Sequence, residues 1–165
     1  MKTILFATLL AALPLSAQSG DAAWKKFDFM LGKWVGAAGE KETPHGAGQG
    51  GFSFEPELNQ KIIVRRNHAE YTSGVKHDDL MIIYLDAPDT PRAIYFDTEG
   101  HVIRYNVTFP EPSKAIFESE ASQPGPRYRL TYWMNGPSMD GKFEIAPPNA
   151  EYKTYMSWSS KKVDH

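Results

Sequence analysis

Cysteine is absent from all 165 residues of the sequence. This absence excludes disulfide bonds, thiolate metal ligands and a cysteine nucleophile. It also means that the packed core must stabilise the fold without cross-links, even in an oxidising compartment where disulfides are permitted.

Long basic runs are absent as well. The sequence has 18 Lys and Arg residues against 20 Asp and Glu residues, a formal net charge of −2, and no basic run is longer than Lys161-Lys162. Proteins that bind nucleic acids neutralise phosphates with a concentrated basic surface. We therefore expect no nucleic-acid partner.

Apolar runs are confined to the start of the sequence. Lys2 precedes an apolar stretch over residues 4–13, and Leu15-Ser16-Ala17 matches a signal-peptidase cleavage site. The stretch is too short to span a bilayer, so the pattern predicts a signal peptide over residues 1–17. We expect a mature chain of residues 18–165 that forms one domain, has no membrane span and is periplasmic or secreted.

Helical patterning is scarce, whereas short β-like segments are frequent. Aromatic residues make up 13% of the sequence, and turn-forming residues recur at short intervals. With one amphipathic stretch over residues 24–31, this pattern predicts an all-β fold: an up-and-down antiparallel barrel of about ten strands with a short N-terminal capping helix. Besides strands around Trp34 and Phe52, the expected strands are 61–66, 79–85, 92–96, 102–109, 114–121, 128–134 and 152–158.

Two glycine-containing segments are interpreted as interruptions of the sheet. Residues 46–51 are expected to form a flexible lid or a bulged strand, because glycine weakens a regular strand. Neither a Lys-Ser/Thr pair nor a helix follows them, so they do not indicate a phosphate-binding loop. Asp140-Gly141 is expected to be a turn.

A turn at residues 98–100 sets the register of one hairpin. With Gly100 in the left-handed conformation, Tyr95 faces Ile103 on one side of the sheet, and Arg104 lies on the other side. Neither side is purely apolar, which is typical of a barrel whose interior holds a ligand. The alternative is that Arg104 points to solvent.

Titratable residues concentrate on two adjacent candidate strands. Residues two apart in a strand share a face, so Arg66, His68 and Glu70 align, and His77 aligns with Asp79. An acid beside a histidine raises its pKa, and an arginine holds an anion. Three interpretations stay open: an exposed ion network, a site for an anion or polar ligand, and acid–base catalysis.

Metal binding is the weakest interpretation of these residues. His68 with Glu70, and His77 with Asp79, offer nitrogen and oxygen ligands of the kind that zinc and iron accept. The spacings typical of metal motifs, His-Glu-x-x-His and Cys-x-x-Cys, are both missing from the sequence. We therefore expect no metal.

The segment 29–36, Phe-Met-Leu-Gly-Lys-Trp-Val-Gly, carries a family resemblance. Together with Gly74, Asp97-x-x-Gly100 and Asp140-Gly141, it resembles the lipocalin-like, calycin-type barrels and, within them, a bacterial secreted family of unknown function (DUF1579-like). The resemblance implies a barrel closed at one end by the N-terminal helix, with a cavity at the other end. It implies structural roles for Gly32, Trp34 and Gly36.

Haem and fatty acids are ligands of similar barrels. The nitrobindins share the Gly-x-Trp-x-Gly segment and hold ferric haem through a histidine near the C-terminus. Here the corresponding strand, 152–158, has no histidine, and His165 alone follows it. Fatty-acid-binding barrels use Arg-x-Tyr, whereas residues 129–132 read Arg-Leu-Thr-Tyr. The resemblance therefore implies neither ligand, and we expect no cofactor.

The sequence as a whole favours a binding module for a small hydrophobic or amphipathic molecule. Two alternatives remain: a small-barrel enzyme that uses a histidine–carboxylate pair drawn from His68, Glu70, His77 and Asp79, and a structural envelope protein with a filled core. Nothing in the sequence indicates the oligomeric state. The expected wall residues are Tyr95, Ile103, Tyr105, Phe109, Tyr132 and Trp133, and the expected polar anchors are Arg66, His68 and Arg104.

Overall fold

A computed structural model describes residues 16–39, 41–120 and 125–163. The helix α1 (Ser16–Lys25) is followed by the short 3-10 helix η1 (Asp28–Met30), so the helical segment starts earlier than residues 24–31 and is split in two. Residues 1–15, which make up most of the predicted signal peptide, lie outside the described residues. No helix in the described part of the chain is both long and apolar enough to cross a membrane.

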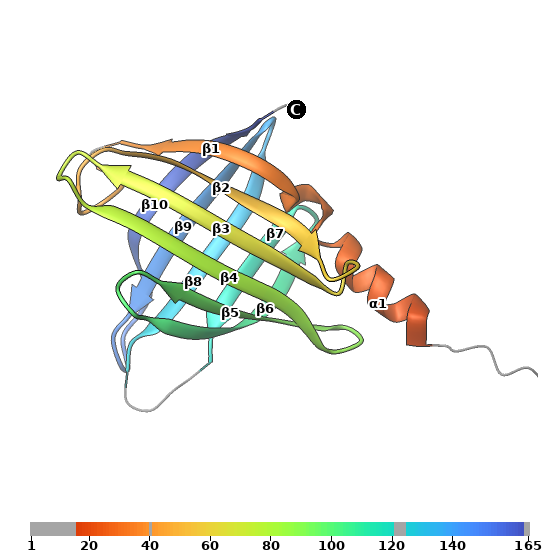
Figure 1. The fold of residues 1–165 in the computed structure, drawn as a ribbon. Coiled ribbons are helices and arrows are strands. Elements are labelled where there is room, and N and C mark those ends of the chain that lie inside the picture. Colours follow the sequence, from red (N-terminus) through yellow and green to blue (C-terminus); the bar gives the residue numbers. More distant parts are fainter. Residues whose placement is uncertain (1–15, 40, 121–124, 164–165) are drawn as a thin grey trace, which may run out of the picture.

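Ten antiparallel strands follow the helices and close into a barrel (Figure 1). Each strand pairs with its neighbours in sequence, and the last strand pairs with the first. The prediction of an up-and-down barrel with a short N-terminal helix is therefore confirmed. The strands are β1 (Gly32–Ala38), β2 (Gly48–Glu57), β3 (Ile62–Tyr71), β4 (Lys76–Ala87), β5 (Thr90–Asp97), β6 (Val102–Glu111), β7 (Lys114–Ser119), β8 (Arg127–Asn135), β9 (Ser138–Ala146) and β10 (Lys153–Lys162).

Two glycine segments do not interrupt the sheet as expected. Gly48 to Gly51 lie within β2 and pair regularly with β1 and β3. Asp140 and Gly141 lie inside β9 and pair with β8 and β10, so the turn predicted there is wrong. The physical reason at Gly141 is space, since a Cβ atom there would lie 2.3 Å from the Trp158 ring.

Large side chains fill the barrel end next to the helices. Trp34 is 2% exposed, and its indole nitrogen donates a hydrogen bond of 2.8 Å to the carbonyl oxygen of Met30. Phe27, just before η1, is fully buried and meets Phe109 edge to face at 4.8 Å. The helical segment therefore closes this end, which we call the closed end (Figure 1).

Small residues replace large ones toward the other end of the same strands. Along the register of β1, β2 and β3, Trp34 pairs with Phe52, whereas two residues further on Gly36 pairs with Gly50, and Gly50 with Ala69. A Cβ atom at Gly50 would lie 2.1 Å from the carbonyl oxygen of His68, so this position excludes any larger residue. The barrel interior is consequently hollow at this end, which we call the mouth.

Candidate functional site

A cavity of about 620 Å³ occupies the mouth half of the barrel. This volume lies within the range of about 300–1,000 Å³ that is usual for small-molecule sites. Its wall has two chemically different sides, because different strands contribute different residue types.

The apolar side of the cavity comes from the last three strands. Leu130 on β8, Phe143 on β9 and Trp158 on β10 line the cavity there. Tyr128 stacks on Phe143 with ring centres 5.8 Å apart and planes 8° apart, which gives this side a rigid aromatic surface. The other members of this side are Ile145, Tyr155 and Met156.

The polar side comes from β3 to β6 and begins deep in the barrel at Arg65. This side chain is buried and forms an ion pair with Asp79. Its guanidinium carbon lies 5.5 Å from the centre of the Phe52 ring and 5.9 Å from that of Tyr132. Burial is the largest single influence and opposes the charge, but the Asp79 carboxylate together with the neighbouring Tyr132 and Tyr95 raises the pKa of Arg65, which stays charged.

Asp79 joins the deep and outer parts of the polar side. Its side chain is 4% exposed and accepts a hydrogen bond of 2.9 Å from the Asn67 amide. The Nε2 atom of His77 lies 3.3 Å from the same carboxylate oxygen, Oδ2. With Arg65 on its other oxygen, Asp79 is a fully partnered buried carboxylate, as burial of a charge requires.

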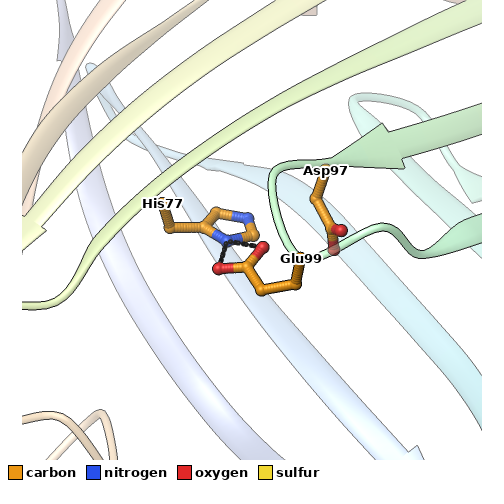
Figure 2. Close-up of side chains that lie close together, drawn as sticks. All are labelled: His77, Asp97 and Glu99. Carbon is orange, nitrogen blue, oxygen red and sulfur yellow. Dashed lines mark hydrogen bonds and ion pairs between the residues drawn. The ribbon is translucent and has the colours of Figure 1, made fainter.

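His77 lies two residues before Asp79 on β4, opposite Ala69 at the mouth end of β3. Its ring points toward Glu99 (Figure 2). Its Nδ1 atom lies 3.0 and 3.1 Å from the two oxygens of Glu99, and its Nε2 atom lies 3.0 Å from the Tyr95 hydroxyl. The hydrogen bond to Asp79 opposes the effect of burial and, with help from Glu99, raises the pKa of His77 to about 9. The imidazole is therefore protonated at neutral pH and donates from both nitrogens.

Asp97 is the second carboxylate at the mouth. It accepts hydrogen bonds of 2.8 Å from the backbone N–H of His101 and from its ring Nδ1. Burial works against the charged form, but these hydrogen bonds prevail and lower the pKa of Asp97. Within the described ranges, one group of residues has ligating atoms close enough for a metal ion: His77, Asp97 and Glu99, within 4.8 Å of one another (Figure 2).

Several residues predicted as wall or catalytic residues do line the cavity. Tyr95, Ile103 and Tyr105 belong to the wall, and so do His77 and Asp79. Tyr132 is fully buried beside Arg65, whereas Phe109 packs at the closed end against Phe27. A binding or catalytic role for the wall residues stays a prediction. Phe109 is half-buried at the closed end and does not line the cavity.

Two of the three predicted anchors, Arg66 and Arg104, lie outside the cavity, and for them this prediction is corrected. Arg66 is 51% exposed and pairs with Glu57 at 2.9 Å on the outer surface. Arg104 alternates with Ile103 and is exposed. His68 borders the cavity, but its ring is 53% exposed and pairs with Asp78 at 2.5 Å. Side chains alternate along a strand, so residues next to inward-facing ones point outward.

The same alternation moves Trp133 and Glu70 to the outer surface. Trp133 follows the buried Tyr132 and is not part of the cavity wall. Glu70 lies 3.4 Å from His68 and 2.7 Å from Lys76 in an exposed ion network. The sequence interpretation of an exposed network thus fits His68 and Glu70, while His77 and Asp79 face inward.

Sequence reasoning missed Arg65, Asn67 and most of the apolar side. The apolar residues 62–64 precede Arg65, and such a run does not show which positions face inward. Three polar atoms in the barrel interior are buried and have no well-aligned hydrogen-bond partner among the described residues: Arg65 Nε, Tyr132 Oη and Trp158 Nε1. No pattern in the sequence predicts that these strands meet, because barrel closure brings them together.

The haem histidine of the nitrobindins has no counterpart on β10. That strand lines the cavity with Tyr155, Met156 and Trp158. The four histidines that line the cavity lie on other segments: His45, His68, His77 and His101. The described residues therefore place no histidine where the nitrobindin resemblance implies the haem ligand.

Comparisons with known proteins support the fold. No protein-family model matches the sequence, and no curated protein matches it significantly. The crystal structure of Rv2717c from M. tuberculosis is similar with a TM-score of 0.64 and 10% identity, covering 86% of this chain and 98% of that one. At this identity the likeness shows the fold alone, and it agrees with the closed antiparallel barrel.

Two fluorescence-related barrels are less similar. EF1p2_mFAP2b bound to DFHBI has a TM-score of 0.47 and 8% identity, with 86% of this chain and 99% of that chain covered. A de novo designed fluorescence-activating β-barrel has a TM-score of 0.41 and 12% identity, with 82% of this chain and 94% of that chain covered. With TM-scores below 0.5, these two likenesses support no conclusion about this protein.

Proposed function

We propose that this protein is a small-molecule-binding barrel that holds a partly apolar ligand in its mouth cavity. The observation that carries the proposal is the cavity of about 620 Å³ with an aromatic and aliphatic side facing a hydrogen-bonding side. Binding sites for small molecules are usually apolar hollows with a few polar groups that orient the ligand.

The glycine and alanine surface beside the cavity supports this proposal over a purely structural role. The closed end contains tightly packed Phe, Met and Trp side chains. The mouth end of the same strands has Gly36, Gly50 and Ala69 in equivalent inward positions. Since empty apolar volume lowers stability, a barrel with a purely structural role gains nothing from this hollow.

We also propose that the protein acts in the periplasm or outside the cell and belongs with the secreted DUF1579-like barrels. The signal-peptide pattern in residues 1–17 and the Gly32-x-Trp34-x-Gly36 segment support this placement. N-terminal sequencing of protein recovered from the periplasm or medium tests it. A mature N-terminus near residue 18 is expected, and an uncleaved chain in the cytoplasm would contradict it.

A fluorescence titration with Nile red tests the binding proposal. This neutral aromatic dye brightens in apolar cavities, and native mass spectrometry of the same sample counts the bound molecules. Ala69→Phe fills the cavity from β3 and is expected to weaken dye binding at least tenfold. Val102→Phe, on a residue that is 58% exposed, serves as the matched control and should leave binding unchanged.

Equal dye affinity in both variants and the unaltered protein would place the dye outside the cavity. Absence of dye binding and of any co-purifying mass would overturn the proposal itself. A co-purifying mass with a Soret absorbance band would show that the ligand is haem.

An enzyme that protonates a ligand in this cavity is the second candidate function. One observation favours it: His77 is protonated and hydrogen-bonded to Tyr95 on the cavity wall. It is thereby placed to act as a general acid toward a bound molecule. Mass spectrometry of a co-purified ligand over time is the test, because conversion that His77→Gln abolishes without loss of binding would establish catalysis.

A further inference from the structure

Carboxylates outnumber Lys and Arg side chains on the cavity's polar side. Arg65 is the one Lys or Arg among the described residues that line the cavity, and it pairs with Asp79. Asp97 and Glu99 line the cavity nearer the mouth, where they pair with His101 and His77. The mouth therefore presents two carboxylates without a Lys or Arg partner from the lining.

Strand register brings carboxylates together inside the barrel. Asp79 on β4 is the direct partner of Asp97 on β5, and both face inward. Like charges in directly opposed positions destabilise a sheet. Arg65, Asn67 and His77 surround Asp79, whereas the hydrogen bonds found to Asp97 come from His101 alone. A cation beside Asp97 would relieve this repulsion.

Glu99 adds a third carboxylate on the turn that follows β5. Figure 2 shows Asp97 and Glu99 on the same side of the cluster, with His77 reaching Glu99 from β4. Their ligating oxygens lie within 4.8 Å of each other. An ammonium group that lies between them forms hydrogen bonds to two charged acceptors, which are stronger than bonds between neutral groups.

The apolar side of the cavity determines the rest of the ligand. Phe143 contacts Tyr128 and lies 6.2 Å, ring centre to ring centre, from Tyr155 near the mouth. Aromatic faces attract organic cations as well as flat apolar groups. Deeper in the cavity, Leu130 and Trp158 offer only a broad apolar contact surface.

We propose that the ligand of this cavity is an aromatic amine-bearing molecule whose protonated nitrogen lies at Asp97 and Glu99. Its ring system lies against Phe143 and Trp158 on the apolar side. This inference rests on the proposed binding function and specifies the chemical class that the same cavity takes.

Calorimetric titration with three naphthalene probes of matched size tests this inference. The probes are 2-naphthylmethylamine, 2-naphthalenemethanol and 2-naphthoate, which are cationic, neutral and anionic at pH 7. With EDTA present, the amine is expected to bind at least tenfold more tightly than the alcohol, and naphthoate most weakly. Glu99→Gln should reduce the preference for amine over alcohol at least threefold, because it removes one of the two carboxylates. Glu99 is exposed, so this substitution leaves the fold intact.

Glu70→Gln is the matched control, because Glu70 also contacts a histidine but lies in the exposed network outside the cavity. It should leave the amine preference unchanged. Nile red binding without an amine preference would overturn this inference and leave the binding function in place. Failure of both Nile red and all three probes to bind would overturn both proposals.

Zinc chloride, titrated alone into EDTA-free protein, separates organic from inorganic cations. Weak or no zinc binding beside tight amine binding is expected. Zinc binding that is lost in Glu99→Gln, without any amine preference, would make the cluster an inorganic cation site and overturn the inference.

Discussion

The closed end and the mouth of this barrel are built on the same strands but packed in opposite ways. At the closed end, Trp34 and Phe54 are buried in a dense aromatic core. At the mouth, the inward positions of β1 to β3 hold Gly36, Gly50 and Ala69, and the polar residues of β3 to β6 replace apolar ones. Stability is therefore concentrated at one end of the barrel, which leaves the other end free to carry unfavourable volume and charge.

Truncation of Trp34 at the closed end should have the largest effect on stability. Loss of a fully buried tryptophan removes its apolar contacts and its hydrogen bond to Met30, so Trp34→Ala should lower the free energy of unfolding by about 3–5 kcal/mol. Trp133→Ala, on the outer surface, should lower it by about 1 kcal/mol at most. Urea denaturation measures both, and similar losses would refute the contrast between core and surface.

The next largest difference in unfolding free energy is expected between substitutions of two neighbouring arginines on β3. Arg65→Met leaves the Asp79 charge buried without its ion pair and should lower the free energy of unfolding by about 3 kcal/mol. Arg66→Met removes an exposed pair with Glu57 and should change it by less than about 0.5 kcal/mol. The double variant Arg65→Met with Asp79→Asn should recover part of the loss; no recovery would show that packing, not charge, holds Arg65.

His77 makes stability depend on pH at the mouth. Its pKa is raised from 6.5 to about 9, so the folded state binds the proton more tightly than the unfolded state. The resulting stabilisation is complete below pH 6.5, decreases above it and is lost as the pH rises through 9. Because the site is partly open to solvent, we expect about 1–2 kcal/mol.

Urea denaturation of the unaltered protein and of His77→Gln at pH 6, 7.5 and 9.5 measures this contribution. The difference between the two proteins should be largest at pH 6 and smallest at pH 9.5. A difference that does not change with pH would contradict the linkage.

The hydroxyl of Tyr132 should have the smallest effect, with the opposite sign. This buried hydroxyl lies beside the Arg65 guanidinium without a well-aligned hydrogen bond, and burial raises the pKa of Tyr132 to about 12. Removing an unpartnered buried hydroxyl abolishes a desolvation cost, so Tyr132→Phe should leave stability unchanged or raise it by up to about 1 kcal/mol. Thermal unfolding measures this, and a lower melting temperature would reveal a hydrogen bond to that hydroxyl.

Local sequence rules predicted the register of the hairpin formed by β5 and β6, because one short turn sets it. Gly100 adopts a positive φ of 88°, and the short turn before it fixes Tyr95 opposite Ile103, as expected. The turn showed which residues share a face of the sheet. It did not show which face lines the cavity, because neither side of this hairpin is purely apolar.

At the start of β3, the sequence does not show which side chains face inward, because the apolar residues 62–64 precede Arg65 and Arg66. Ile63, Val64 and Arg65 are all buried, so the alternation that separates inner from outer positions is hidden at the start of β3. The prediction therefore placed Arg66 inside instead of Arg65. The cavity as a whole depends on contacts between strands far apart in the sequence, and no local pattern contains that information.

Pairing of the first and last strands determines when folding can finish. Trp34 on β1 pairs with Lys162 on β10, and the backbone N–H of Val163 donates a 2.9 Å hydrogen bond to the carbonyl oxygen of Lys33. The closing contacts thus join residues at opposite ends of the barrel sequence, a long-range arrangement that slows folding. Until synthesis reaches β10, β1 and β9 both present unpaired edges, and the nascent chain is open to aggregation at those edges.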